Sequence, residues 1–375
     1  MIQLDALPSA ADFYARYWNR QPFMVRGGVP EDVISALISA DELAGLALDD
    51  GPQSRMVRNA DWTCTFGPLT EQDFTDAGEA DWSLLVQNVE QFHPPTAALL
   101  PCFGFAPRWL MDDIMVSYSA TGGSVGPHVD SYHVFLVQGQ GRRRWTVGRQ
   151  PLGRENYIEG LDLKILHEPI EGDEIEVRRG DVLYVPPKFG HEGISLEDSL
   201  TFSIGFLGPR MSDLMGAYGH YLSQREDTDR RYVGEDLTPA SAGSVIDTIT
   251  VEDIRDRLTR QLGSADFSRW LVGFFAEQSH PDMAQGEQRE ETLSADQLRA
   301  RLQQGAALIK PQQIKFTLAI APSGEACLGF LGDSMALHSD LVPVAEKLIQ
   351  GQPVANIDAL EFLRRLYNLQ VLEFI

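Results

Sequence analysis

The chain has 375 residues, of which 43% are hydrophobic, and it carries a formal net charge of −23 at pH 7. This length exceeds that of a single small barrel and predicts two or three domains with substantial cores. The excess of carboxylates argues against general affinity for nucleic acid, and it fits either a basic protein partner or simple solubility.

Neither a membrane span nor a disulfide framework is expected. No apolar run approaches the about eighteen residues that a membrane helix needs, and the N-terminus is acidic where a secretion signal would be basic. We therefore expect a soluble cytoplasmic protein without membrane contact. The cysteines at positions 64, 102 and 327 are few, odd in number and widely spaced, which predicts reduced thiols instead of disulfides or a zinc site.

Consecutive antiparallel strands are predicted from about residue 112 to residue 209. Short β-branched or aromatic runs, separated by Gly, Pro and Asp, are typical of such strands. The runs cover residues 114–119, 132–137, 143–147, 182–185 and 200–206. They indicate a double-stranded β-helix, the jelly-roll or cupin barrel, in a protein of the α+β class.

A metal-ligand pattern lies within this strand region. Gly126-Pro127-His128-Val129-Asp130 is followed, further along the chain, by a segment that ends in His191. On an extended strand, residues two positions apart point to the same face, so His128 and Asp130 would lie together. With His191 from a neighbouring strand they would form a triad of two histidines and one carboxylate. This ligand set suits Fe(II) and leaves positions open for a cosubstrate and dioxygen.

A buried arginine is predicted beside the metal. If Trp145 faces the barrel interior, alternation places Arg143 inside with it, and Arg142 and Arg144 outside. A buried guanidinium needs an acidic partner, and its planar shape matches a carboxylate. The distal carboxylate of 2-oxoglutarate is a natural candidate, with the hydroxyl of Ser117 assisting. The alternative is that the three arginines form a solvated or nucleic-acid-binding patch.

The other histidines lack a comparable partner at ligand spacing; they are His93, His133, His167, His220, His280 and His338. His133 lies three residues after Asp130, on the opposite face by strict alternation. Two roles stay open for His133: simple packing, or a contact at the rim of the site.

Helices are predicted beyond Pro209. Apolar residues at helical spacing mark residues 210–222, 251–262 and 267–275. Core packing is the simplest explanation of these stripes, and an exposed stripe would indicate a dimer interface. The polar stretches 225–242 and 278–294 are predicted to be a loop and a linker.

The last eighty or so residues predict a separate small domain. A capping signal at Ser294 begins a helix, strands are expected at 315–320 and 326–331, and helices at 342–349 and 359–369. This order is similar to that of a winged-helix module. The last helix is mixed in charge, which favours protein contact or scaffolding over DNA binding.

The segments from about residue 112 to residue 209 resemble the JmjC-type cupins of the ribosomal oxygenase family, and especially the bacterial arginine hydroxylases of large-subunit ribosomal protein sixteen. The resemblance rests on Ser117, on residues 126–130 and 141–145, and on residues 180–193, in the family's order. It extends to three segments near the start, namely 13–18, 22–25 and 82–87.

The resemblance implies that His128, Asp130 and His191 hold Fe(II), and that Arg143 and Ser117 hold 2-oxoglutarate. It implies no catalytic residue beyond the metal ligands. It also implies a homodimer that pairs through a helical middle region. The expected domains are a JmjC cupin with an N-terminal elaboration (1–209), a helical dimerisation region (210–293) and a winged-helix-like domain (294–375).

The expected function is a dioxygenase that uses Fe(II) and 2-oxoglutarate to hydroxylate a protein side chain, with an arginine of a basic ribosomal protein as the favoured target. Two alternatives stay open: a metal-dependent cupin oxygenase that acts on a small molecule without 2-oxoglutarate, and a non-catalytic cupin interaction protein. The sequence does not distinguish a target arginine from a target histidine. Asp112, Asp113 and Tyr132 are candidate contacts for a guanidinium.

Overall fold

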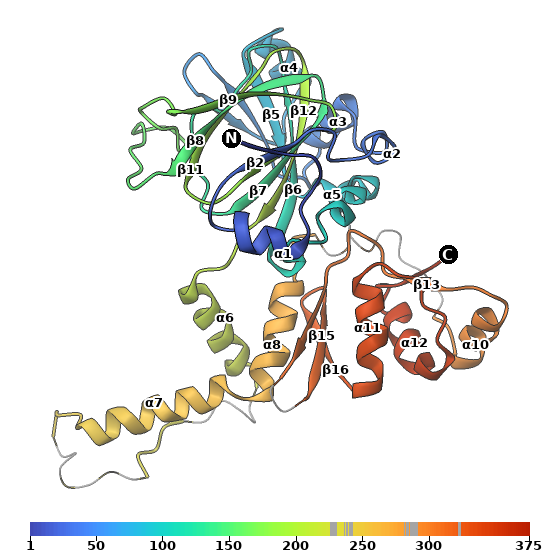
Figure 1. Cartoon of the computed structure of the whole chain (residues 1–375). Helices are drawn as coiled ribbons and strands as arrows, with labels where there is room; N and C mark the ends of the chain where they lie inside the picture. The colour runs from blue at the N-terminus through green and yellow to red at the C-terminus, as the bar shows by residue number, and fades with distance from the viewer. Residues whose placement is uncertain are drawn as a thin grey trace. The chain divides into compact units, whose positions relative to one another are not determined.

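The computed structural model describes residues 1–225, 231–235, 237, 239, 243–280, 282, 285, 292–321 and 324–375. The chain forms two compact units. The first is Met1–Gly208 with Asp282–Gly286, and the second is Pro209–Pro281 with Glu287–Ile375. Strands dominate the first unit, and the second combines helices with a small sheet (Figure 1).

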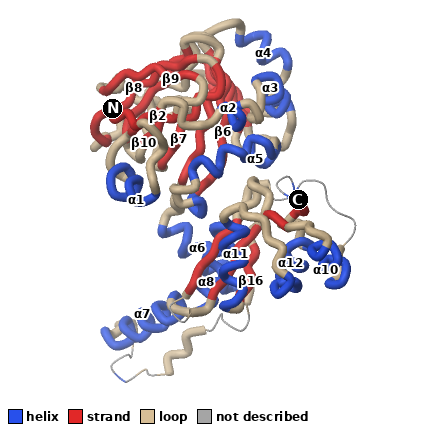
Figure 2. The backbone as a smooth tube through the Cα atoms, turned by 45° about the vertical axis from the view of Figure 1, so that its right-hand side comes forward, coloured by secondary structure: helices blue, strands red, loops and turns tan. Residues whose placement is uncertain are grey.

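Two sheets form the first unit (Figure 2). The nine-stranded sheet has the order β1 (Ile2–Leu4), β2 (Phe23–Val25), β10 (Val182–Val185), β7 (His133–Gln140), β12 (Ser199–Phe206), β6 (Met111–Ser119), β5 (Trp82–Val86), β3 (Ser54–Arg58), β4 (Cys64–Phe66). The three-stranded sheet has the order β11 (Phe189–Ser195), β8 (Arg142–Pro151), β9 (Gly172–Arg178). At the centre of the sheets, β10 pairs with β7, β12 lies between β7 and β6, and β11 pairs with β8, all of them strands distant in the chain, as a double-stranded β-helix requires. The predicted cupin fold is confirmed.

The central strands are buried on both faces. On β7, Val134 and Leu136 pack between the two sheets, whereas Phe135 and Val137 belong to the core on the outer side of the nine-stranded sheet. All residues of β12 are buried. Burial on both faces explains why β7 and β10 contain nearly continuous apolar runs.

The N-terminal segments cover the outer face of the nine-stranded sheet. The ring of Phe135 is 4.7 Å from that of Phe103 and 5.7 Å from those of Phe13 and Phe105, between ring centroids. The covering elements are α1 (Ala10–Asp12), the π-helical turn η1 (Phe13–Tyr17), α2 (Glu31–Ile34), α3 (Ala40–Leu48), α4 (Glu71–Ala77), α5 (Val89–Phe92) and the 3-10 segments η2 (Pro94–Phe103) and η3 (Arg108–Leu110).

The second unit places helices around an antiparallel sheet of β14 (Phe316–Ile320), β15 (Ala326–Phe330) and β16 (Asp333–Leu337). Its helices are α6 (Met211–Ser223), α7 (Thr248–Leu262), α8 (Ala265–Ala276), α10 (Ala295–Gln303), α11 (Val342–Ile349) and α12 (Leu360–Asn368), with 3-10 turns η5 (Ser339–Leu341) and η6 (Ile357–Ala359). A short pair of strands, β13 (Leu308–Ile309) and β17 (Glu373–Phe374), completes it.

The sequence analysis did not predict three described strands of this unit, namely β13, β16 and β17. The sequence of β16, Asp-Ser-Met-Ala-Leu, has no β-branched or aromatic residue, and its strand conformation comes from pairing with β15. The predicted loop 225–242 and linker 278–294 fall partly outside the described residues. Among the residues that the structure describes, no helix has the length and apolarity to cross a membrane.

Candidate metal centre

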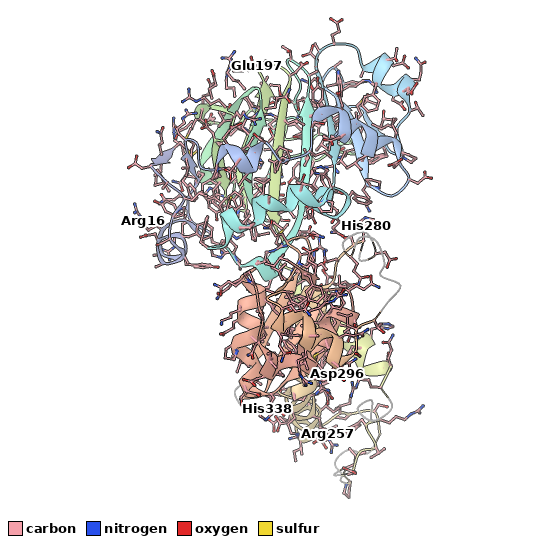
Figure 3. All side chains as sticks on the ribbon, turned by 90° about the vertical axis from the view of Figure 1, so that its right-hand side faces the viewer. Arg16, Glu197, Arg257, His280, Asp296 and His338 are labelled. Atoms are coloured by element: carbon pink, nitrogen blue, oxygen red, sulfur yellow. The ribbon has the colours of Figure 1, made fainter. Side chains whose placement is uncertain are left out.

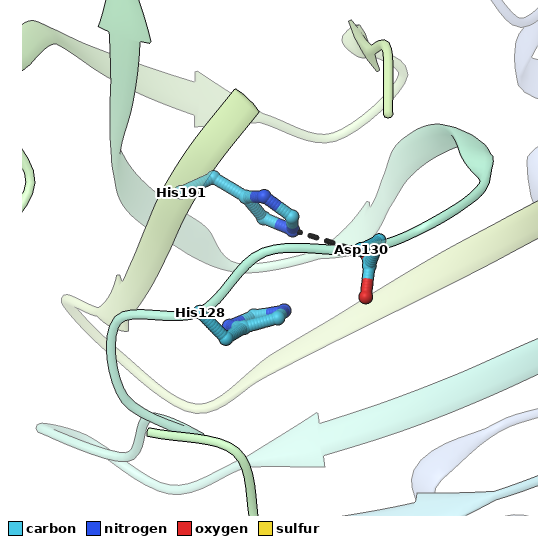
Figure 4. A group of neighbouring side chains, drawn as sticks. All are labelled: His128, Asp130 and His191. Carbon is cyan, nitrogen blue, oxygen red and sulfur yellow. Dashed lines mark ion pairs between the residues drawn. The ribbon is translucent and has the colours of Figure 1, made fainter. Parts of the chain in front are cut away.

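His128, Asp130 and His191 converge (Figure 4). One potential ligand atom from each lies within 4.8 Å of the others. The Nε2 atom of His191 is 3.4 Å from Oδ2 of Asp130, and the two imidazole centroids are 4.3 Å apart. This spacing lets a single divalent ion contact all three side chains.

The expectation that His128 and Asp130 belong to a strand is wrong. They lie in the connection between β6 and β7, where His128 forms an isolated β-bridge with His191 of β11 through two backbone hydrogen bonds. Gly126 has a left-handed backbone (φ 77°) and is followed by a proline, which has no N–H to donate to a ladder. The carbonyl of Asp130 instead accepts the N–H of Lys188 at 2.9 Å.

Backbone carbonyls orient both imidazoles. The Nδ1 atom of His128 is 2.9 Å from the carbonyl oxygen of Gly126, and Nδ1 of His191 is 3.1 Å from that of Phe189. A carbonyl can only accept, so each Nδ1 carries the proton and each Nε2 keeps a free lone pair. Such outer hydrogen bonds are the usual way in which proteins fix the tautomer of a metal-binding histidine.

Burial and mutual attraction set the charges of the triad. Burial and the neighbouring His191 lower the pKa of His128 to about 4, so this imidazole is neutral at neutral pH. Burial alone would raise the pKa of Asp130, but the neighbouring imidazoles of His191 and His128 outweigh it and lower that pKa. A neutral imidazole and an ionised carboxylate are the protonation states that a divalent metal binds.

Arg143 is buried, with 2% of its surface exposed, and no described carboxylate forms an ion pair with it. Its Nη1 donates to Thr201 Oγ1 at 3.3 Å and Ser117 Oγ at 3.5 Å, and its Nη2 donates to the Gly193 carbonyl at 3.3 Å. Its Nε has no partner. Burial lowers the pKa of Arg143 to about 10, which still leaves the guanidinium charged at neutral pH.

The predicted alternation along β8 is confirmed, because Arg142 and Arg144 are exposed on either side of buried Arg143. Arg142 forms surface ion pairs with Glu176 and with Glu197, which Figure 3 labels. A solvated patch is therefore the correct description of Arg142 and Arg144, and the wrong one for Arg143.

One cavity joins the triad to the arginine. Residues of both sheets line it, and the polar ones beside the triad and Arg143 are Ser117, Tyr132, Thr201 and Ser203. The sequence interpretation overlooked Thr201 and Ser203. Together with Ser199 they are the hydroxyl-bearing residues at alternating positions of β12, and this regular spacing on one face of a strand is a signal that the sequence analysis could have used.

Comparison with known proteins agrees with this geometry. Residues 98–214 match the family model described as JmjC domain. Over 305 residues the chain is 36% identical to the Escherichia coli ribosomal protein uL16 3-hydroxylase, a match that covers 80% of this chain and 79% of that protein. The chain belongs to the JmjC-domain family of ribosomal oxygenases.

Other members of the ribosomal oxygenase family are similar as well. The chain is 40% identical over 208 residues to a probable ribosomal oxygenase of Haemophilus influenzae, covering 54% of this chain and 50% of that one. The solved structure of E. coli YcfD has a TM-score of 0.82 at 31% identity, covering 97% of this chain and 98% of that chain. YcfD in complex with cobalt and 2-oxoglutarate has a TM-score of 0.78 at 30% identity, covering 97% of each chain.

In this member of the family, Gly193 leaves room for the side chain of Arg143. A Cβ at position 193 would lie 2.7 Å from Nε of Arg143 and 2.8 Å from the ring of Trp145. The guanidinium also lies over that ring, with its carbon 5.0 Å from the ring centroid. A glycine at this position of β11 is therefore what lets Arg143 occupy its place between the sheets.

His133 packs against aromatic residues and does not face the triad. Its ring stacks on Trp18 with centroids 3.4 Å apart, and its Nδ1 is 2.8 Å from the hydroxyl of Tyr184. Burial lowers its pKa to about 4. The remaining histidines also lie outside the triad; His93 contacts Thr96, and His280 and His338, labelled in Figure 3, belong to the second unit.

Proposed function

We propose that the chain is a dioxygenase that uses Fe(II) and 2-oxoglutarate to hydroxylate an arginine of a large-subunit ribosomal protein. The observation that carries the proposal is a single cavity that holds a His-Asp-His triad together with a buried guanidinium that pairs with no carboxylate among the described residues. The names of the relatives support it: one is a uL16 3-hydroxylase, and YcfD has been solved with cobalt and 2-oxoglutarate.

The chain's own residues fit these groups. The free Nε2 atoms of His128 and His191 and the carboxylate of Asp130 would hold the iron. The distal carboxylate of 2-oxoglutarate would receive hydrogen bonds from Arg143, whose Nε is unpaired, and from Ser117. When bound, iron and the oxo-acid activate dioxygen for hydroxylation of an unactivated C–H bond. The protein's part is to hold both groups, exclude water and present the substrate carbon.

Asp113 and Tyr132 are the proposed contacts for the substrate guanidinium. Both side chains lie beside Gly205, 3.7 Å from where its Cβ would be, and the hydroxyl of Tyr132 also bonds to the carboxylate of Asp130. Burial and the neighbouring Glu90 raise the pKa of Asp113 to about 7, so a bound cation would favour its ionised form. The third candidate, Asp112, is exposed.

The two alternatives explain less of the structure. A cupin oxygenase that uses no oxo-acid would leave the charge of Arg143 buried without an anion, at a cost of several kcal/mol. A non-catalytic cupin would have no use for two imidazoles held by carbonyls with both Nε2 atoms facing one carboxylate. Stoichiometric release of succinate on consumption of 2-oxoglutarate separates the proposed function from both.

The substrate is tested by mass spectrometry of large-subunit ribosomal proteins from cells with and without this gene. We expect one basic protein to lose a mass of one oxygen atom from an arginine when the gene is absent, and to regain it when the gene is returned. A protein set that is identical in both cells would rule out the ribosomal substrate. Loss of oxygen from a histidine would keep the enzyme class and overturn the choice of residue.

Homodimerisation through the helical region is part of the proposal. Exposed apolar side chains recur along α7 at Val251, Ile254, Leu258 and Leu262, and Leu258 is 60% exposed. On α6, Met211 and Met215 are 70% and 65% exposed, one helical turn apart. Such apolar stripes are costly in water and are typical of protein interfaces.

Leu258→Glu is expected to convert the dimer to a monomer, because it places a charge within the apolar stripe of α7. Light scattering at micromolar concentration measures the mass. Thr259→Glu adds the same charge at the next position of the same helix, which lies outside the stripe, and should remain dimeric. A wild-type protein of monomeric mass would exclude this pairing.

The three-domain division at residues 209 and 293, and the winged-helix character of residues 294–375, stay predictions. On α12, Arg364 pairs with Glu361 of the same helix, so the charge of this cation is offset. This supports a protein-contact or scaffolding role without direct nucleic-acid binding. A ribosomal substrate would place the enzyme in the cytoplasm.

A further inference from the structure

Three neighbouring strands bring polar side chains into one row beneath Arg143. Ser117 of β6 is paired in register with Thr201 of β12, and Thr201 is paired with Gln138 of β7. All three are buried, with Gln138 only 1% exposed. Arg143 reaches this row from the opposite sheet and donates to Ser117 and Thr201. Gln138 does not touch the arginine, but it touches the residue that does.

The groups at the two ends of this chain of hydrogen bonds, the guanidinium of Arg143 and the backbone carbonyl of Gln140, fix which atom donates and which accepts along it. Arg143 can only donate, so the oxygen of Thr201 accepts from it at 3.3 Å. At the other end, the backbone carbonyl of Gln140 can only accept, so the amide nitrogen of Gln138 must face it, at 2.7 Å. The amide oxygen of Gln138 is thereby turned toward Thr201 and accepts its hydroxyl proton at 3.1 Å.

The two hydroxyls beside Arg143 therefore differ. The proton of Thr201 is committed to Gln138, which leaves its lone pairs for the guanidinium. Among the residues that the structure describes, the acceptor of the Ser117 proton is the distant carbonyl of Thr201, at 3.5 Å. A carboxylate bound at Arg143 can accept a hydrogen bond from the Ser117 hydroxyl at little cost, whereas Thr201 accepts from the guanidinium on its other side.

The backbone of Gln138 is itself anchored. Its N–H donates to the carbonyl of Asp181 at 3.0 Å, and its carbonyl accepts from the N–H of Gly180 at 2.8 Å. Asp181 is buried and forms an ion pair with Arg26. The turn that leads into β10 thus fixes the backbone of Gln138, from which the side-chain amide reaches Thr201.

We infer that Gln138 is a positioning residue for the carboxylate-binding site: through Thr201 it fixes Arg143 as a donor aimed at the distal carboxylate of 2-oxoglutarate. The inference rests on the proposed function. It predicts that a change at position 138 weakens binding of the oxo-acid without altering the metal site, although position 138 contacts neither group.

The experiment measures binding to the full chain loaded with Mn(II), in the absence of turnover, by isothermal titration calorimetry. Gln138→Leu should raise the dissociation constant for 2-oxoglutarate by about 3- to 10-fold, the value of a typical net hydrogen bond. The affinity for Mn(II), and the affinity for oxalate, which chelates the metal but has no distal carboxylate, should stay at the wild-type values. Gln140→Leu is the matched control, because it changes an exposed glutamine of the same strand and keeps the backbone carbonyl.

A double-mutant cycle tests the route through Thr201. If Gln138 acts by orienting that hydroxyl, Gln138→Leu should add almost nothing to the effect of Thr201→Val, whereas independent effects would multiply and overturn the inference. Wild-type affinity for 2-oxoglutarate in Gln138→Leu would overturn it, and so would an equal loss of oxalate affinity. Thermal melting shows whether each variant folds, and Gln138→Asn, which keeps an amide but shortens its reach, replaces Gln138→Leu if that variant does not. Failure of the wild-type protein to bind 2-oxoglutarate would instead remove the proposed function.

Discussion

Replacing Asp130 by asparagine should abolish succinate formation and lower the affinity for Mn(II) by at least about 100-fold. Loss of an outer hydrogen-bond partner alone costs a metal site about 10- to 100-fold, and Asp130 supplies the only carboxylate of the triad. The asparagine amide keeps the shape but loses the negative charge that a divalent ion requires. Calorimetric titration with Mn(II) and a succinate assay measure the two effects.

The fold of Asp130→Asn should be intact, because the carbonyl of residue 130 still accepts the N–H of Lys188. Thermal melting of the metal-free protein is the check, with Asp76→Asn, a surface change on α4, as the control that should bind Mn(II) normally. Retention of wild-type Mn(II) affinity in Asp130→Asn would show that the ion is bound elsewhere.

Replacing Arg143 by methionine should raise the dissociation constant for 2-oxoglutarate by at least about 100-fold, since each hydrogen bond from a charged donor contributes about 1.5 to 3 kcal/mol. Lysine should not substitute for it, because an ammonium cannot present the planar pair of donors that matches a carboxylate. Titration of the Mn(II)-loaded protein measures the loss. Arg144→Met removes the same charge from an exposed neighbour on β8 and should bind as wild type.

The same Arg143 variant should be at least as thermally stable as wild type when no ligand is present. Replacing even a complete buried ion pair by apolar side chains is often neutral or stabilising by about 1 to 4 kcal/mol, and the buried guanidinium of the free protein has no described anion to compensate its desolvation. A clear loss of melting temperature in Arg143→Met would mean that the arginine serves the fold and not a ligand.

The sequence was sufficient for the His128–Asp130 pair and for the inward direction of Arg143 because both follow from short-range patterns, whereas His191 joins them from about sixty residues further along the chain. A fixed spacing joins His128 to Asp130, and alternation with Trp145 decides which of three arginines is buried. The strand assumption for His128 failed, since Gly126 and the proline after it set the path of the segment between β6 and β7. The ligands nevertheless meet, because His191 pairs directly with His128 across that segment.

The supporting residues could not be found in this way. Thr201 and Gln138 are neighbours only because β12 lies between β6 and β7, and that order is a property of the barrel and not of any local run. Gly193 matters because β11 pairs with β8, which places it against Arg143. Register between strands distant in the chain is set by the burial of whole faces, which a single segment does not reveal.

The contacts on the outer face and at the edge of the nine-stranded sheet limit which fragments of the chain can be expected to fold. The family pattern occupies residues 98–214, yet β10 is flanked by β2, and Phe135 is covered by Phe13. A fragment limited to those residues would present an open strand edge and bare aromatic rings to water, conditions that promote aggregation. We therefore expect residues 98–214 alone not to form a stable barrel, because the first hundred residues supply the strand beside β10 and the rings that cover Phe135.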